Sequence, residues 1–180
     1  MCLALVAAGS ARAETAIWTF RWEGANGYAM TGALAFDAAI AERRRVTERD
    51  LTCFAITGTR DGRILGRWSL GALTPDTSWR LHFDGRAGVF LVEGMGVRMP
   101  QAWNMNGRGD DCGEDGFGFN VGNLGQDVCV DGALVESSRI DPPTPLPATR
   151  VQRHGFPRGA CRLPDLLSRL RPGAAEAGES

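Results

Sequence analysis

The dipeptide Asp61-Gly62 constrains the fold of this chain more than any other feature of its sequence. Apolar and polar residues alternate on both sides of it, in the segments LTCFAITGT and ILGRWSL. A tight turn of the primed type needs positive φ angles, which Asp-Gly adopts at low cost. The stretch from Leu51 to Phe83 is therefore predicted to form antiparallel hairpins, around which the rest of the chain is organised.

The same alternation recurs elsewhere. Ala16–Glu23 places Trp18, Phe20 and Trp22 on one face, and Tyr28–Asp37 continues the pattern after a glycine-containing turn. About ten short strands, with turn signals roughly every eight to twelve residues, are typical of all-β domains. The predicted fold is an antiparallel β-sandwich or a flattened barrel that buries its tryptophans.

Three segments are expected to interrupt this pattern. Residues 38–50 are the most helix-like part of the first half, and the run Arg43-Arg44-Arg45 favours a solvated loop over a contact with an anion or polymer. Gly32 marks a bulge or a bend inside a strand. Because Pro100 cannot donate to a strand ladder, residues 97–105 are predicted to be an edge strand or an irregular segment.

The chain divides into three parts by composition. Residues 1–13 are an apolar run that ends in Ala11-Arg12-Ala13, which predicts a secretory signal peptide. The β domain is expected to span residues 14–139. From residue 140 the sequence DPPTPLPATR predicts a linker that does not continue a sheet, so residues 140–180 are expected to be a linker and a mostly disordered tail, with one short helix over residues 161–170.

Export determines the expected oxidation state of the cysteines. Four remain after the predicted signal peptide, and disulfides are the default in a periplasmic or extracellular compartment. Cys112 and Cys129 flank one glycine-rich hairpin and are predicted to pair. Cys53 is either a buried free thiol or a partner of Cys161, which has the alternative of pairing with another chain.

Four acidic residues lie in the glycine-rich stretch between Asn104 and Asn120, namely Asp110, Asp111, Glu114 and Asp115. Calcium prefers about six to eight oxygen ligands on a flexible loop, so calcium is the one cofactor that the sequence suggests. The spacing does not match the EF-hand loop, and the alternative is a solvated polar loop. A further hypothesis is that acids in the loop 110–115 serve a small secreted hydrolase of glycan or peptide.

Three aromatic residues, Trp103, Phe117 and Phe119, suggest a platform on which sugars or lipids stack, with core packing as the alternative. A lipocalin-like carrier of a small apolar ligand is another possibility, and it requires a hollow barrel. The net charge of −1 gives no indication of nucleic acid as a partner, and no later segment has the length and apolarity of a membrane span.

The segments AIWTF and TGALAFD, together with GFGFNVGN and CVDGALVES, resemble the opening and closing strands of an uncharacterised bacterial secreted β domain. Domains of that kind often precede a PEP-CTERM sorting tail, although no VPEP-type motif follows in this chain. The resemblance implies a secreted β domain and supplies no catalytic residues. We therefore expect an exported, non-catalytic binding or surface module that contacts an extracellular or cell-surface polymer.

Overall fold

The computed structural model describes residues 14–92 and 99–162. The predicted signal peptide (residues 1–13), the predicted helix beyond residue 162 and the C-terminal tail lie outside the described residues. Within them, thirteen strands pair antiparallel in two sheets, with one helix, α1 (Ala38–Arg43), and two 3-10 turns, η1 (Leu70–Ala72) and η2 (Glu136–Ser138). The predicted all-β antiparallel fold is confirmed.

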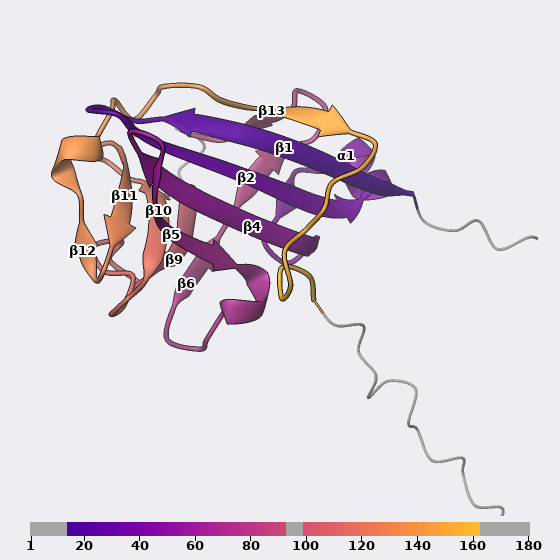
Figure 1. Ribbon diagram of the computed structural model, residues 1–180. Helices are drawn as coiled ribbons and strands as arrows, with labels where there is room; N and C mark the ends of the chain where they lie inside the picture. Colours follow the sequence, from indigo (N-terminus) through magenta and orange to yellow (C-terminus); the bar gives the residue numbers. More distant parts are fainter. Residues whose placement is uncertain (1–13, 93–98, 163–180) are drawn as a thin grey trace, which may run out of the picture.

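The large sheet has eight strands and forms a strongly curled half-barrel (Figure 1). Its strand order is β3 (Val46–Thr47), β7 (His82–Asp84), β8 (Val89–Phe90), β13 (Leu146–Val151), β1 (Thr15–Glu23), β2 (Tyr28–Asp37), β4 (Leu51–Arg60) and β5 (Arg63–Ser69).

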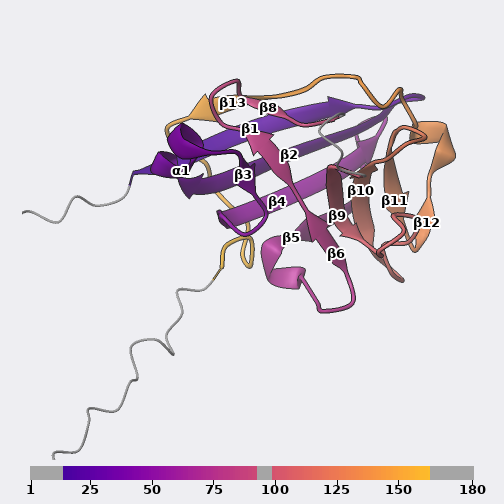
Figure 2. The same cartoon turned by 180° about the vertical axis from the view of Figure 1, so that it is seen from behind.

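The small sheet has five strands and lies at one end of the long strands β1, β2 and β4, whose direction it crosses (Figure 1). Its strand order is β12 (Ala133–Leu134), β11 (Gln126–Val130), β10 (Phe117–Val121), β9 (Gln101–Met105) and β6 (Ser78–Arg80). Figure 2 shows α1 and β3 at the end of the molecule that is far from β11 and β12.

The predicted Asp-Gly turn is present. Asp61 and Gly62 have φ angles of 48° and 79° and connect β4 to β5. Asp131 and Gly132 connect β11 to β12 with φ angles of 50° and 73°. Positive φ at both central positions is the requirement of the primed hairpin turn, so local sequence determines both connections.

Aromatic side chains fill the space between the two sheets. The rings of Phe20, Phe90 and Phe119 lie 5.4, 5.3 and 4.9 Å from the ring of Trp103, measured between centroids. Edge-on and tilted contacts of this kind add to the stabilisation that comes from burial. The predicted burial of tryptophans is confirmed for Trp22 and Trp68, whereas Trp18 and Trp79 are only partly buried. Trp22 also donates from Nε1 to Gln126 Oε1 at 3.0 Å.

The expected bulge at Gly32 is wrong. Gly32 pairs with Phe20 in a regular register, and a Cβ atom on it would lie 2.3 Å from the Phe20 ring. A register shift between β2 and β4 occurs three residues later, between Ala35 and Phe36. The glycine is therefore explained by the aromatic ring that covers it.

The expected end of the domain at residue 139 is wrong. Residues 146–151 form β13, which pairs with both β1 and β8 in spite of Pro147. The chain then crosses in front of β2 to reach β4 (Figure 1), where Cys161 forms a disulfide with Cys53. Backbone hydrogen bonds from Phe54 N to Ala160 O and from Arg162 N to Thr52 O hold the same segment. Ala148, next to Pro147, donates its N–H to Gly88 O at 2.8 Å, so a donor is present beside the proline. Because β13 and Cys161 are joined to the large sheet, the described chain belongs to one domain up to residue 162.

The segment 38–50, expected to be the most helix-like part of the first half, contains the six-residue helix α1, followed by β3. One further expectation is corrected. The described part of the segment 97–105 contains β9, which lies between β10 and β6 and is therefore not an edge strand. Pro100 precedes the first residue of β9, where the missing donor does not interrupt the ladder.

Both disulfides are formed, Cys53–Cys161 and Cys112–Cys129, and the predicted pairing of Cys112 with Cys129 is confirmed. Two disulfides are consistent with an oxidising, extracytoplasmic compartment. Within the described residues, no helix has the length and apolarity needed to cross a membrane.

Candidate functional site

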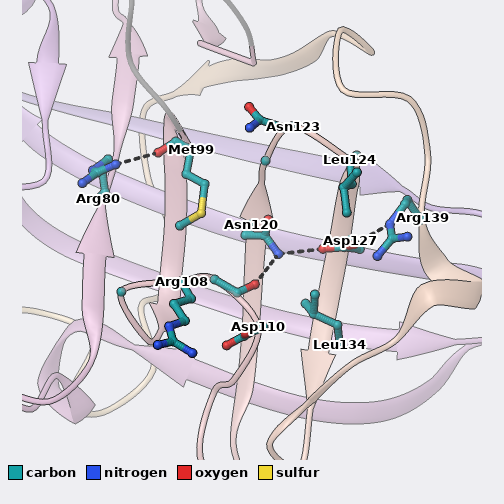
Figure 3. A pocket seen from close by; sticks show the side chains of 14 residues that line it. Arg80, Met99, Arg108, Asp110, Asn120, Asn123, Leu124, Asp127, Leu134 and Arg139 are labelled. Carbon is teal, nitrogen blue, oxygen red and sulfur yellow. Dashed lines mark hydrogen bonds and ion pairs between the residues drawn. The ribbon is translucent and has the colours of Figure 1, made fainter.

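A polar cleft of about 680 Å³ opens on the outer face of the small sheet (Figure 3). Its walls come from β6, β10, β11, the loop that holds residues 107–110, the turn at residues 122–125, and the segment after η2. The polar and charged residues that line it include Arg80, Arg108, Asp110, Asn120, Asp127 and Arg139.

The period of two along a strand explains why polar groups reach this face. Phe119 of β10 and Val128 of β11 pair with each other and are buried in the aromatic core. Their neighbours Asn120 and Asp127 also pair, so their side chains project from the opposite face of the sheet. Asn120 Nδ2 donates to Asp127 Oδ1 at 2.6 Å.

Asp127 is the most constrained carboxylate of the cleft. Its side chain is 3% exposed, and Arg139 Nε donates to its Oδ2 at 2.8 Å. Burial raises the pKa of Asp127, and the charge of Glu136 adds to this effect, while the hydrogen bond and charge of Arg139 and the hydrogen bond from Asn120 oppose it. The net pKa lies above the ordinary value because these partners do not fully replace the water that burial removes.

The loop beside the cleft is held by its own hydrogen bonds. Asn106 Oδ1 accepts from the backbone N–H groups of Arg108, Gly109 and Asp110. The disulfide between Cys112 and Cys129 ties the end of this loop to β11. The loop therefore carries its side chains on a fixed backbone.

A second buried amide connects this loop to β10. Asn104 has a φ angle of 54°, unusual for a strand residue, and its Nδ2 donates to Phe117 O at 2.9 Å and to Cys112 O at 3.3 Å. Through these two hydrogen bonds the Asn104 side chain links β9 to β10 and to the loop that holds Cys112.

The structure does not bring the four predicted calcium ligands together. Asp110 borders the cleft and accepts from Asn106 Nδ2, whereas Asp111 Oδ1 accepts from Gly113 N. The amide of Asp115 donates to Asp131, and Glu114 is exposed. Across residues 14–92 and 99–162, no three acidic, histidine or cysteine side chains are grouped so that they could hold a metal ion.

The predicted aromatic platform is wrong, and the core-packing alternative is correct. Trp103, Phe117 and Phe119 are fully buried between the sheets. Phe117 lies against paired glycines, since a Cβ atom on Gly58 or Gly66 would lie within 2.6 Å of it. These rings join the two sheets and offer no surface to a ligand.

Sequence reasoning missed Asn120, Asp127 and Arg139. A signal was present, because FGFNV and QDVCV each place one polar residue at an outward position of an apolar strand. The strand pattern gave no indication that Arg139, twelve residues from Asp127, forms an ion pair with Asp127 in the folded chain.

The fold and the disulfides define the class: a disulfide-bonded all-β domain of a kind consistent with export. Comparisons with family models, curated proteins and solved structures found no match to the chain. The resemblance to secreted β domains that precede PEP-CTERM tails stays a prediction.

Proposed function

We propose that this protein is an exported, non-catalytic binding domain, and that the cleft on the small sheet is its ligand site. The observation that carries the proposal is the arrangement of Asn120, Asp127 and Arg139, three polar side chains that hold one another in fixed positions at the wall of an open cleft. Prepositioned polar groups reduce the entropy that a ligand loses on binding.

Binding is favoured over catalysis by the way Asp127 is used. One carboxylate oxygen accepts from Asn120 and the other accepts from Arg139. A general base needs an oxygen within hydrogen-bond reach of the substrate proton. Asp127 is instead placed to orient Asn120 and Arg139 toward a ligand.

The two alternatives from the sequence have less support. A lipocalin-like carrier needs a hollow interior, whereas aromatic side chains fill the space between the sheets. A hydrolase built on the loop 110–115 needs acids that converge, whereas the carboxylates of Asp110 and Asp111 accept from different groups, Asn106 Nδ2 and the backbone N–H of Gly113.

The location is part of the proposal. We propose that residues 1–13 are removed during export and that the mature protein, which begins at Glu14, acts in the periplasm or outside the cell on a surface or extracellular polymer. Mass spectrometry of the protein recovered from a periplasmic or culture fraction tests this, and a cytoplasmic protein with free thiols would contradict it.

The binding site is tested by NMR titration of the oxidised, isotope-labelled protein with a panel of neutral and acidic oligosaccharides. We expect saturable shifts of the backbone amides of Asn120, Gly122, Gly125 and Asp127. Saturable shifts confined to another face, or no shift with any member of the panel, would overturn the proposed site.

A further inference from the structure

We infer that the ligand of the cleft is an acidic saccharide. Arg139 holds its carboxylate, Arg108 attracts the anion from the opposite wall, and its hydroxyl groups contact the amide side chains of the cleft. This inference rests on the proposed function and deepens it. Four features of the cleft carry it: an arginine with a free edge, a second free arginine, unused amide oxygens and an exposed apolar residue.

Arg139 has one side of its guanidinium occupied and the other side available. Its Nε donates to Asp127, while its two Nη atoms have no partner within the described residues. The side chain is 26% exposed and lies on the wall of the cleft. The two Nη groups form a fork that matches the two oxygens of a carboxylate, and the bond to Asp127 fixes the direction of this fork.

Arg108 supplies a second cation from another wall. The backbone N–H of Arg108 donates to Asn106 Oδ1 at 3.1 Å, so its backbone is held, while its guanidinium has no partner within the described residues. Figure 3 shows Arg108 and Arg139 on opposite sides of the Asn120–Asp127 pair. In this view the guanidinium of Arg108 is directed away from that pair, so Arg139 borders the pair and Arg108 supplies positive charge from the opposite wall.

The remaining groups fit hydroxyls better than a second charge. Asn120 uses Nδ2 for Asp127 and Gly109 O, and its Oδ1 has no partner within the described residues. Asn123 and Leu124 lie at the rim in Figure 3, and Leu124 is 78% exposed. A sugar presents hydroxyls to amide oxygens and carboxylates, and C–H groups to an apolar side chain such as Leu124.

The charge of the anion is limited by its surroundings. Asp110 and Asp127 both line the cleft, so a doubly charged phosphate meets more repulsion there than a singly charged carboxylate. Arginine forks accept both kinds of oxyanion, which means that the experiment has to separate them.

Calorimetric titration of the oxidised wild-type protein with trigalacturonate tests the inference. Its fully methyl-esterified form has the same hydroxyls without the charge, and inorganic phosphate has the charge without the sugar. We expect trigalacturonate to bind at least about tenfold more tightly than the ester or phosphate, and to weaken as salt is added.

The variants are chosen to keep the fold. Arg139→Lys retains a cation for Asp127 and removes the fork, and Arg108→Gln changes an exposed side chain. Each is expected to weaken trigalacturonate binding about tenfold with an unchanged melting temperature, while Arg153→Gln, an exposed arginine outside the cleft, leaves binding unchanged.

Equal affinity for the acid and the ester, tighter binding of phosphate, or wild-type affinity in both cleft variants would overturn the inference. If neutral sugars still shift the amides of the cleft, the proposed function survives while the inference fails. If no oligosaccharide shifts them, both fail.

Discussion

The part of the chain that the structure describes includes two partly buried aspartate–arginine pairs, Arg44–Asp50 and Arg139–Asp127. The first lies between α1 and β4 and the second contains Asp127 of β11; Figure 2 shows α1 and β11 at opposite ends of the molecule. Beside α1, Arg44 donates through both Nη atoms to the two oxygens of Asp50, and Thr47 adds its backbone N–H and its hydroxyl. On the small sheet, Arg139 donates to Asp127 through Nε alone. The Asp50 pair is closed, because its hydrogen-bonding groups are used within the protein, whereas the Asp127 pair is open.

The pKa values of the two carboxyl groups are shifted in opposite directions, in agreement with this difference in hydrogen bonding. Burial acts to raise the pKa of Asp50, but the hydrogen bond from Arg44, those from Thr47 and the charge of Arg44 hold it below its ordinary value. Burial raises the pKa of Asp127 above its ordinary value in spite of Arg139. The closed pair stabilises the fold. The open pair leaves a buried charge less well compensated, and it keeps an arginine fork available to a ligand.

Each pair also lies close to a disulfide in the sequence, and the two disulfides give the largest expected effects. Cys53–Cys161 closes a separation of 108 residues and Cys112–Cys129 one of 17. In the chain-entropy model, replacing both cysteines by alanine costs about 4.7 kcal/mol for the first and about 3 kcal/mol for the second. Urea unfolding of the two double variants measures both values.

Ligand binding distinguishes the two disulfides further. The double alanine variant at Cys112 and Cys129 releases the loop that carries Arg108 and is expected to weaken ligand binding. The variant at Cys53 and Cys161 is expected to bind as the wild type does at temperatures where both are folded. A greater loss of binding in the Cys53 and Cys161 variant would contradict the assignment of the ligand site to the cleft on the small sheet. The reverse order of the stability losses would contradict the chain-entropy expectation.

Removing each arginine tests the difference between the open and the closed pair. Arg139→Leu leaves Asp127 buried with only Asn120 as a partner, and we expect a loss of about 3 kcal/mol in the free energy of unfolding. Arg44→Leu leaves Asp50 with both hydrogen bonds from Thr47, and Arg44 is 54% exposed, so we expect a smaller loss than for Arg139→Leu. Equal losses in urea unfolding would show that the two pairs are energetically alike.

The tight turns of the fold could be predicted from the sequence, because their backbone conformation depends on the residues of the turn itself. Asp61-Gly62 forms the expected turn because its φ angles depend on the two residues themselves. The position of β9 was not predictable in this way. Its neighbour β6 is more than twenty residues distant in the chain, and which strands become neighbours is decided by packing.

The same limit explains the errors at the C-terminus and at the site. A proline-containing segment becomes β13 because two other strands offer it a place in the sheet, which its composition does not reveal. Clustered charges drew the prediction to the loop 110–115, whereas the cleft depends on Asn120, Asp127 and Arg139, which stand singly in the sequence and meet only in the folded chain.

The smallest effect is the pH dependence, which has opposite signs for the two aspartates. The folded-state pKa of Asp127 is above the ordinary value of 3.8, so its native state holds the proton more tightly. Its contribution to the free energy of unfolding falls as the pH rises from the ordinary value through the folded-state pKa. The folded-state pKa of Asp50 is below 3.8, so its contribution is complete above that value and is lost as the pH falls through the folded-state pKa.

Urea unfolding of wild type, Asp127→Asn and Asp50→Asn between about pH 3 and about pH 7 separates the two contributions. The stability of wild type relative to Asp127→Asn should decrease with rising pH above the ordinary value of 3.8, whereas its stability relative to Asp50→Asn should increase up to that value and then stay constant. Parallel curves for the two variants would mean that Arg139 compensates Asp127 as completely as Arg44 compensates Asp50. In that case Asp127 would be as well compensated as Asp50, although Arg139 contacts it through Nε alone. The open and the closed pair would then not differ in their electrostatic energy.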